Sequence, residues 1–162
     1  MPELWWIPIG VGACVAFYFF FWRPLRLASQ EARFAEARRY FHIQREHLEA
    51  RFVTLAAEKA RPHGPHWDDC EFEDDVAYVR DRSTGELSAF VGVAVATDEP
   101  PSSTGGMGDL IGNLRAGTAI FRFHRGHWET DGGAILNLSP TEAIRFYQNR
   151  LEMVGQEFAG QS

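Results

Sequence analysis

The longest apolar stretch of the chain lies at its N-terminal end and limits what the chain can fold into. Residues 4–22 are uncharged and mostly apolar, and Arg23-Pro24-Leu25-Arg26 follows at once. A helix over these residues is about 28 Å long, close to the thickness of the hydrocarbon core of a bilayer. The pattern predicts a single membrane-spanning helix, with residues 1–26 forming the anchor and its flanks.

The residues beside this stretch predict its orientation. A cleaved secretory signal fits less well, because Glu3 precedes the stretch and no basic residue does. Basic residues follow it instead, and they are Arg23, Arg26, Arg33, Arg38 and Arg39. The positive-inside bias predicts a single-pass protein of a bacterial inner membrane, with the N-terminus outside and the remaining chain in the cytoplasm.

The remaining residues predict a long helix followed by one small domain. Residues 27–60 contain no glycine or proline and favour a helix. The sequence Arg61-Pro62-His63-Gly64-Pro65 ends it and marks a linker over residues 61–69. Residues 70–155 then form the predicted α+β domain, and residues 156–162 form a loose tail. The expected fold class is an N-terminal transmembrane helix plus an α+β domain.

One face of the predicted long helix carries an apolar seam. Its residues recur every seven positions and are Leu27, Phe34, Phe41, Leu48 and Leu55. The intervening positions are polar, whereas a two-stranded coiled coil needs apolar residues at both core positions of the heptad. We therefore expect the later half of the seam to pack on the chain's own sheet. Self-association, or a protein partner, on this seam is the second interpretation.

Two hairpins and a final helix are predicted in the domain, giving a sheet of about four antiparallel strands. Residues 70–80 and 87–97 flank a strong turn, and the second of these strands is apolar on both faces, as a central strand is. Residues 98–113 are too long for a tight turn and form a loop that is flexible, functional or both. In the second hairpin, a turn at Arg125-Gly126 places Phe123 opposite Trp128 and Arg122 opposite Glu129.

The last predicted helix has a complete start signal. Ser139 and Glu142 form a capping box, and Pro140 occupies the first helical position. The predicted buried face of this helix consists of Ile144, Tyr147, Leu151 and Val154, and the helix is predicted to end at Gly155. With the long helix against the sheet, the order of elements is similar to a cystatin-like or NTF2-like arrangement.

The candidate metal-ligating residues form two groups in the sequence. His63, His66 and Cys70 lie beside a run of acidic residues, and His124 faces His127 across the second hairpin. Zinc accepts such ligands, but their spacing matches no standard zinc finger. We therefore expect solvated turn histidines, no metal and no cofactor. The alternative interpretation of His124 and His127 is that the two residues form a protonation switch.

No motif in the chain predicts catalysis. There is no Gly-x-Ser-x-Gly sequence, and the carboxylates around Cys70 are expected to raise the pKa of its thiol and suppress the thiolate. The glycines of residues 105–112 lack the Lys-Ser/Thr of a phosphate-binding loop. The sequence therefore favours a protein that is not an enzyme.

The charge of the domain excludes one class of partner. Residues 67–162 carry seven basic and sixteen acidic side chains, a formal charge of minus nine. Phosphate backbones repel such a domain, so nucleic acid is not an expected partner.

Residues 113–148, NLRAGTAIFRFHRGHWETDGGAILNLSPTEAIRFYQ, resemble a block near the C-terminus of planctomycete-type bacterial membrane-anchored proteins of uncharacterised activity. That resemblance implies a topology and a source, and no activity. The leading functional hypothesis is a noncatalytic, membrane-anchored protein that presents an acidic α+β domain to a protein partner. The alternatives are a ligand-binding or hydrolytic domain with a pocket between helix and sheet, and a homo-oligomeric membrane scaffold.

Overall fold

The computed structural model of the chain describes residues 6–60, 64–97 and 114–159, without most side chains before Glu31. It divides into two units, Met1–Arg39 and Tyr40–Ser162, which we describe separately. The elements are α1 (Trp6–Lys59), β1 (Pro65–Asp81), β2 (Leu87–Thr97), β3 (Leu114–His124), β4 (His127–Glu129), β5 (Ala134–Leu136), α2 (Pro140–Phe146) and β6 (Leu151–Glu157).

The first unit contains the N-terminal part of α1 and corrects the prediction of a membrane anchor. The helix does not end at the basic residues after the apolar stretch but continues through them to Lys59. Among the residues that the structure describes, no helix has an apolar stretch long enough to cross a membrane. This finding contradicts the predicted span over residues 4–22 and the inner-membrane location.

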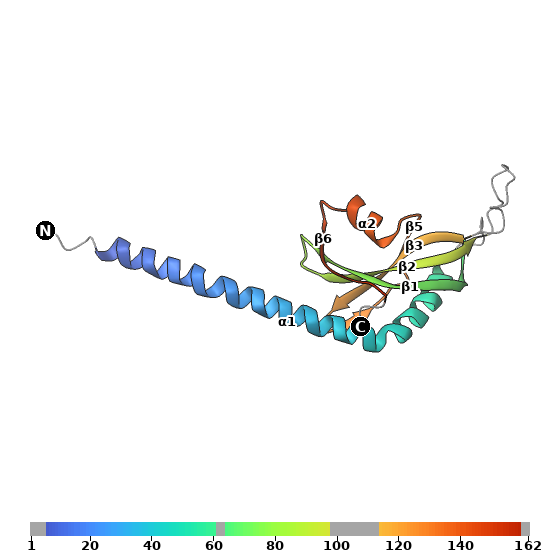
Figure 1. Cartoon of the computed structure of the whole chain (residues 1–162), viewed down its shortest axis with the longest axis horizontal. Coiled ribbons are helices and arrows are strands. Elements are labelled where there is room, and N and C mark those ends of the chain that lie inside the picture. Colours follow the sequence, from blue (N-terminus) through green and yellow to red (C-terminus); the bar gives the residue numbers. More distant parts are fainter. Residues whose placement is uncertain (1–5, 61–63, 98–113, 160–162) are drawn as a thin grey trace. The chain divides into compact units, whose positions relative to one another are not determined.

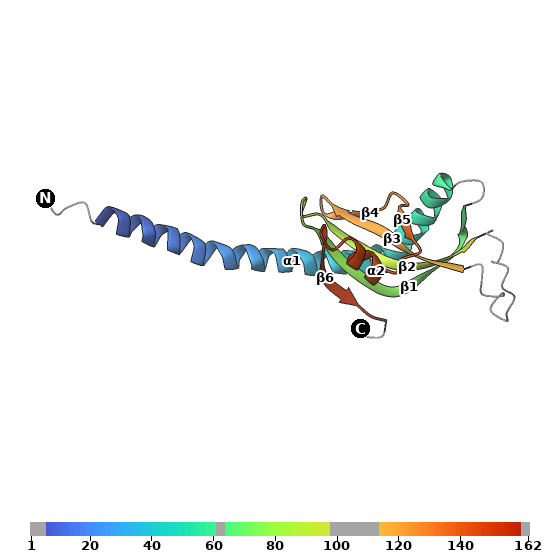
Figure 2. The ribbon, with the colours of Figure 1, turned by 90° about the horizontal axis from the view of Figure 1, so that it is seen from above.

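The second unit contains an antiparallel sheet of six strands, larger than the predicted sheet of about four. Its order is β4-β3-β2-β1-β6, and β5 also pairs with β3. The C-terminal part of α1 covers one face of the sheet and α2 covers the other (Figures 1 and 2). This arrangement, with two covered faces, replaces the expected cystatin-like or NTF2-like one.

Aromatic side chains join α1 to the sheet. Phe41 is fully buried, and its ring lies 4.9 Å from that of Trp128 and 5.6 Å from that of Phe121. Phe52, also fully buried, lies 5.4 Å from the ring of Trp67, and all three contacts are edge-to-face. Packing of the later half of the seam on the chain's own sheet is thus confirmed.

The opposite face of the sheet packs on α2. Its buried cluster contains Ala77 and Val79 of β1, Phe90 of β2, and Ala143 and Ile144 of α2. Alternate residues of β1 and β2 point to opposite faces, so both strands are apolar on both sides. The prediction that residues 87–97 form a central strand is confirmed by the pairing of β2 with β1 and β3.

The second predicted hairpin is confirmed residue by residue. Phe123 lies opposite Trp128, Arg122 opposite Glu129 and His124 opposite His127. Arg125 and Gly126 both have positive φ, as a type I′ turn requires, although arginine is unusual in that position.

The capping box of the last helix is also confirmed, but the length of that helix is not. Ser139 and Glu142 exchange the two expected hydrogen bonds, and the helix ends at Phe146. Residues 151–157 form β6 and pair with β1, although the helix was predicted to continue to Gly155 and the loose tail to begin at residue 156. Without β6 the N–H and C=O groups along one edge of β1, a strand with both faces covered, would lack partners. This tertiary requirement outweighs the helical spacing of Leu151 and Val154.

Two irregularities in pairing explain why apolar and polar residues do not alternate regularly along β1. Its register with β2 shifts between His66 and Glu71 and again between Phe72 and Val76. At the second shift the guanidinium of Arg45 donates hydrogen bonds to the carbonyl oxygens of Glu73 and Asp74. Arg45 of α1 therefore supplies donors to backbone groups that the bulge leaves out of the ladder.

The turn between β1 and β2 is held by one carboxylate. Asp81 accepts hydrogen bonds from the backbone N–H groups of Ser83 and Thr84, from the Ser83 hydroxyl, and from Nε of Arg150 at 2.6 Å. The bonds from Ser83 and Arg150 hold the pKa of Asp81 well below its usual range. One carboxylate thus ties the turn to the segment that leads into β6.

We expect Phe41→Ala to destabilise the domain by about 3–5 kcal/mol, the cost of removing a buried aromatic ring. Urea unfolding followed by circular dichroism measures the change. Ile43→Ala, on the same helix at a position 68% exposed, is the control and should change stability by less than about 0.5 kcal/mol. Equal effects of the two substitutions would contradict the packing described above.

We expect Asp81→Asn to lower the urea midpoint at pH 7. A carboxylate whose pKa is lowered by folding stabilises the fold above its unfolded pKa of about 3.9, and this stabilisation is lost as the pH falls below that value. The difference between wild type and variant should therefore narrow below about pH 4. Asp74→Asn, at a side chain 83% exposed, is the control. A difference that stays constant with pH would argue against the carboxylate's role.

Candidate functional site

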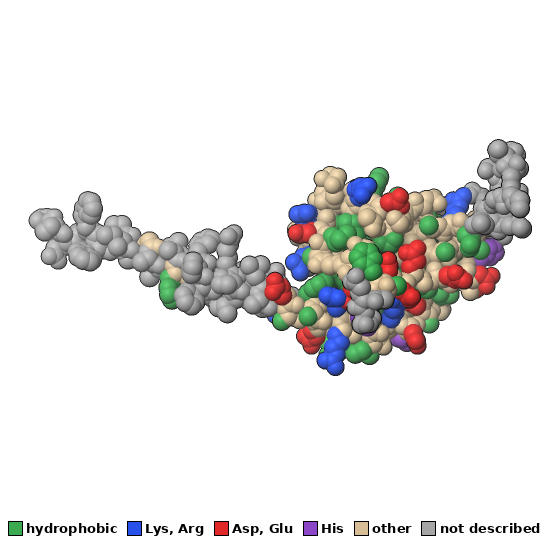
Figure 3. Space-filling view, in the orientation of Figure 1, with side chains coloured by type: hydrophobic (Ala, Val, Ile, Leu, Met, Phe, Trp, Pro, Cys, Tyr) green, Lys and Arg blue, Asp and Glu red, His purple; other side chains and the backbone are tan. Residues whose placement is uncertain are grey.

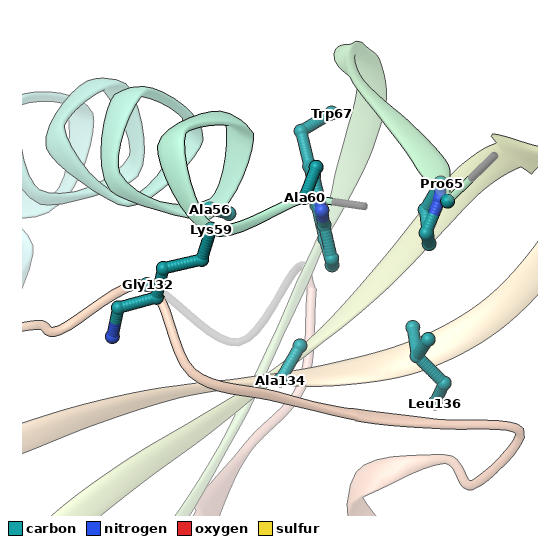
Figure 4. Close-up of a pocket in the computed structure, with 9 residues that line it drawn as sticks. Ala56, Lys59, Ala60, Pro65, Trp67, Gly132, Ala134 and Leu136 are labelled. Atoms are coloured by element: carbon teal, nitrogen blue, oxygen red, sulfur yellow. The ribbon is translucent and has the colours of Figure 1, made fainter. Parts of the chain in front are cut away.

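A pocket opens where α1 ends beside the sheet. Its volume is about 260 Å³. It is lined by Ala56, Lys59 and Ala60 of the helix end, Pro65 and Trp67 of β1, and Ala134 and Leu136 of β5 (Figure 4). Gly64 and Gly132 complete the lining. Trp67 is the largest wall residue, and Phe52 beneath it fixes its ring at 5.4 Å.

Gly132 lets the loop between β4 and β5 approach the helix. Its φ is +71°, and a Cβ added there would lie 2.6 Å from the backbone nitrogen of Ala56. The loop is fixed by hydrogen bonds from Gly132 N–H to the Thr130 hydroxyl and from that hydroxyl to the carbonyl of Ile120. Gly132 of this loop therefore forms part of the pocket wall.

The pocket lining holds one ionisable side chain, Lys59. Its ammonium donates to the carbonyl oxygen of Asp131 and lies 3.9 Å from the Asp131 carboxylate. No histidine, cysteine or carboxylate belongs to the described lining. The pocket therefore offers apolar contact and one paired cation, and it lacks the groups of an acid–base or nucleophilic site.

The first group of predicted ligands does not form a site. His63 lies outside the described residues, and His66 is exposed on β1. Cys70 is half-buried, and burial raises the pKa of its thiol, with smaller contributions from Glu49 and Asp68. The expected direction of this shift is confirmed, although burial and not charge is its largest cause.

The second group lies at the other end of the sheet. His124 and His127 are exposed at the tip of the β3–β4 hairpin, and Nε2 of His127 lies 3.8 Å from the Glu129 carboxylate. His66 pairs with Ala96 near one end of β2. Phe123, next to the hairpin tip, pairs with Leu87 at the other end of β2. Nine residues of strand separate these positions, or about 30 Å. Within the described residues, no three His, Cys, Asp or Glu side chains are grouped to hold a metal ion.

One polar cluster was missed by sequence reasoning. Oε2 of Glu157 on β6 accepts a hydrogen bond from the hydroxyl of the fully buried Tyr78 at 3.0 Å, and Nε2 of His42 on α1 lies 2.6 Å from it. None of the three residues lines the pocket. The cluster links α1, β1 and β6, so its geometry fits a structural role. No sequence signal identified it, because Glu157 was predicted to lie in the loose tail of residues 156–162.

Comparisons with protein-family models, curated proteins and solved structures found no match to this chain.

We expect Gly132→Ala to destabilise the domain by about 2–4 kcal/mol. About 1 kcal/mol comes from the left-handed φ and the rest from contact with the backbone of α1. Gly126→Ala is the matched control, because Gly126 has φ +86° and nothing within 4 Å of its added Cβ. Thermal unfolding compares the two variants, and an equal loss in both would contradict the close approach of the loop to α1.

Proposed function

We propose that this chain is a noncatalytic binding domain whose pocket at the end of α1 receives one apolar side chain of a partner protein. The observation that carries this proposal is the lining of the pocket. Its larger wall residues are Pro65, Trp67 and Leu136, and its one ionisable group is already paired with Asp131. Apolar walls beside a small open cavity favour an anchor residue of the kind that dominates protein interfaces.

The pocket is small compared with the sites that bind cofactors or larger metabolites. Pockets for such ligands usually measure about 300–1,000 Å³, and this one measures about 260 Å³. The volume suits one aromatic or branched side chain. A hydrolytic role gains no support from the described lining, which contributes no general base and no nucleophile.

The apolar seam of α1 is a weaker candidate for partner contact. Phe41 and Leu48 are buried, and Phe41 packs on the domain's own sheet. Partner contact through these residues would require the domain to open, at a cost of several kcal/mol for each large side chain exposed. The pocket needs no such opening.

The proposal predicts that indole, used as a mimic of an apolar side chain, binds in the pocket with a Kd of about 1 mM, as expected for so small a ligand. In an ¹H–¹⁵N spectrum of the full chain, the indole N–H of Trp67 and the amides of Ala134 and Leu136 should shift. Ala134→Phe, which fills the pocket, should abolish these shifts.

Ala116→Phe is the matched control, because Ala116 is exposed on β3 and does not line the pocket. This variant should respond to indole as wild type does. Circular dichroism confirms that both variants fold. Shifts that are absent in wild type, or that persist in Ala134→Phe, would overturn the proposal.

A further inference from the structure

Four acidic residues lie within two positions in sequence of residues that line the pocket. Asp68 and Asp69 follow Trp67 directly, Glu58 precedes Lys59, and Asp131 precedes Gly132; all four carboxylates are exposed. Along a strand each residue advances about 3.3 Å, so Asp68 and Asp69 lie within about 7 Å of Trp67 along β1. Figure 3 shows further acidic side chains on the surface of this domain.

Positive charge does not balance these carboxylates. Lys59 is the one described cation of the lining, and both Lys59 and Arg122 lie within 4.0 Å of the Asp131 carboxylate. The carboxylates of Glu58, Asp68 and Asp69 remain beside the lining. The surrounding segment 67–162 carries a formal charge of minus nine, so its long-range field has the same sign.

From this charge distribution we infer that the partner segment is basic, with one apolar anchor residue flanked by lysine or arginine. The inference rests on the proposed function and adds the chemical class of the partner. An anchor seated against Trp67 brings side chains one or two residues away within reach of Asp68 and Asp69. Lysine and arginine can meet these carboxylates while their aliphatic stems cover the apolar rim. Charge complementarity of this kind raises the association rate and selects against acidic partners.

Fluorescence anisotropy with short labelled peptides and the full chain tests the inference. One peptide has a central tryptophan flanked by lysines, a second replaces the lysines with serines, and a third keeps the lysines and replaces tryptophan with alanine. At low salt the lysine–tryptophan peptide should bind at least about tenfold tighter than the serine peptide, and added salt should reduce the difference.

Paired variants locate the charges. Asp68→Asn with Asp69→Asn should weaken the lysine–tryptophan peptide about three- to tenfold and leave the serine peptide unchanged. Asp74→Asn with Asp75→Asn is the matched control, with the same chemistry on the same strand beyond the first register shift. This control pair should change neither affinity by more than about twofold.

The possible outcomes separate the two proposals. If both tryptophan peptides bind in the pocket with equal affinity, the basic partner is overturned and the binding function stands. If the alanine peptide binds as tightly as the lysine–tryptophan peptide, attraction is not coupled to the pocket and the inference is also overturned. If neither tryptophan peptide binds, the binding function itself fails.

Discussion

The packing of Phe41 and Phe52 against the sheet is the interaction on which the rest of the domain depends. Strands β1 and β2 are apolar on both faces, so each face of the sheet must be covered. α2 is only seven residues long and covers one face. The other face is covered by α1. Its residues Phe41 and Phe52 contact aromatic rings on β1, β3 and β4.

The pocket lies at the point where α1 ends and no longer covers the sheet. α1 ends at Lys59, and Ala60 closes it with a hydrogen bond to the carbonyl of Ala57. The apolar face of the sheet continues beyond this point with Trp67, Ala134 and Leu136. Since the loop at Gly132 already touches the helix backbone, the helix end is fixed beside the half-buried Ala134 and Leu136.

Local signals predicted part of this structure, and the parts that depend on distant contacts were missed. The turn at Arg125 and the capping box at Ser139 are encoded within a few residues, and both are confirmed. β6 was missed because its conformation is decided by the edge of β1, some seventy residues earlier in the chain. Trp67 fell within a predicted linker, so its contact with Phe52, and hence the pocket, could not be inferred. The predicted anchor was contradicted because no helix among the described residues is long and apolar enough to cross a membrane.

Native-state hydrogen exchange of the full chain tests most directly whether α1 and the sheet form one cooperative unit. We predict that amides of α1 between Phe41 and Phe52 exchange as slowly as those of β2, because both are released only by global unfolding. The difference in their free energies of exchange should be below about 1 kcal/mol. If the amides of α1 exchange as those of an exposed helix while β2 remains protected, the helix is not an integral cover of the sheet. The account of the core and of the pocket would then be wrong.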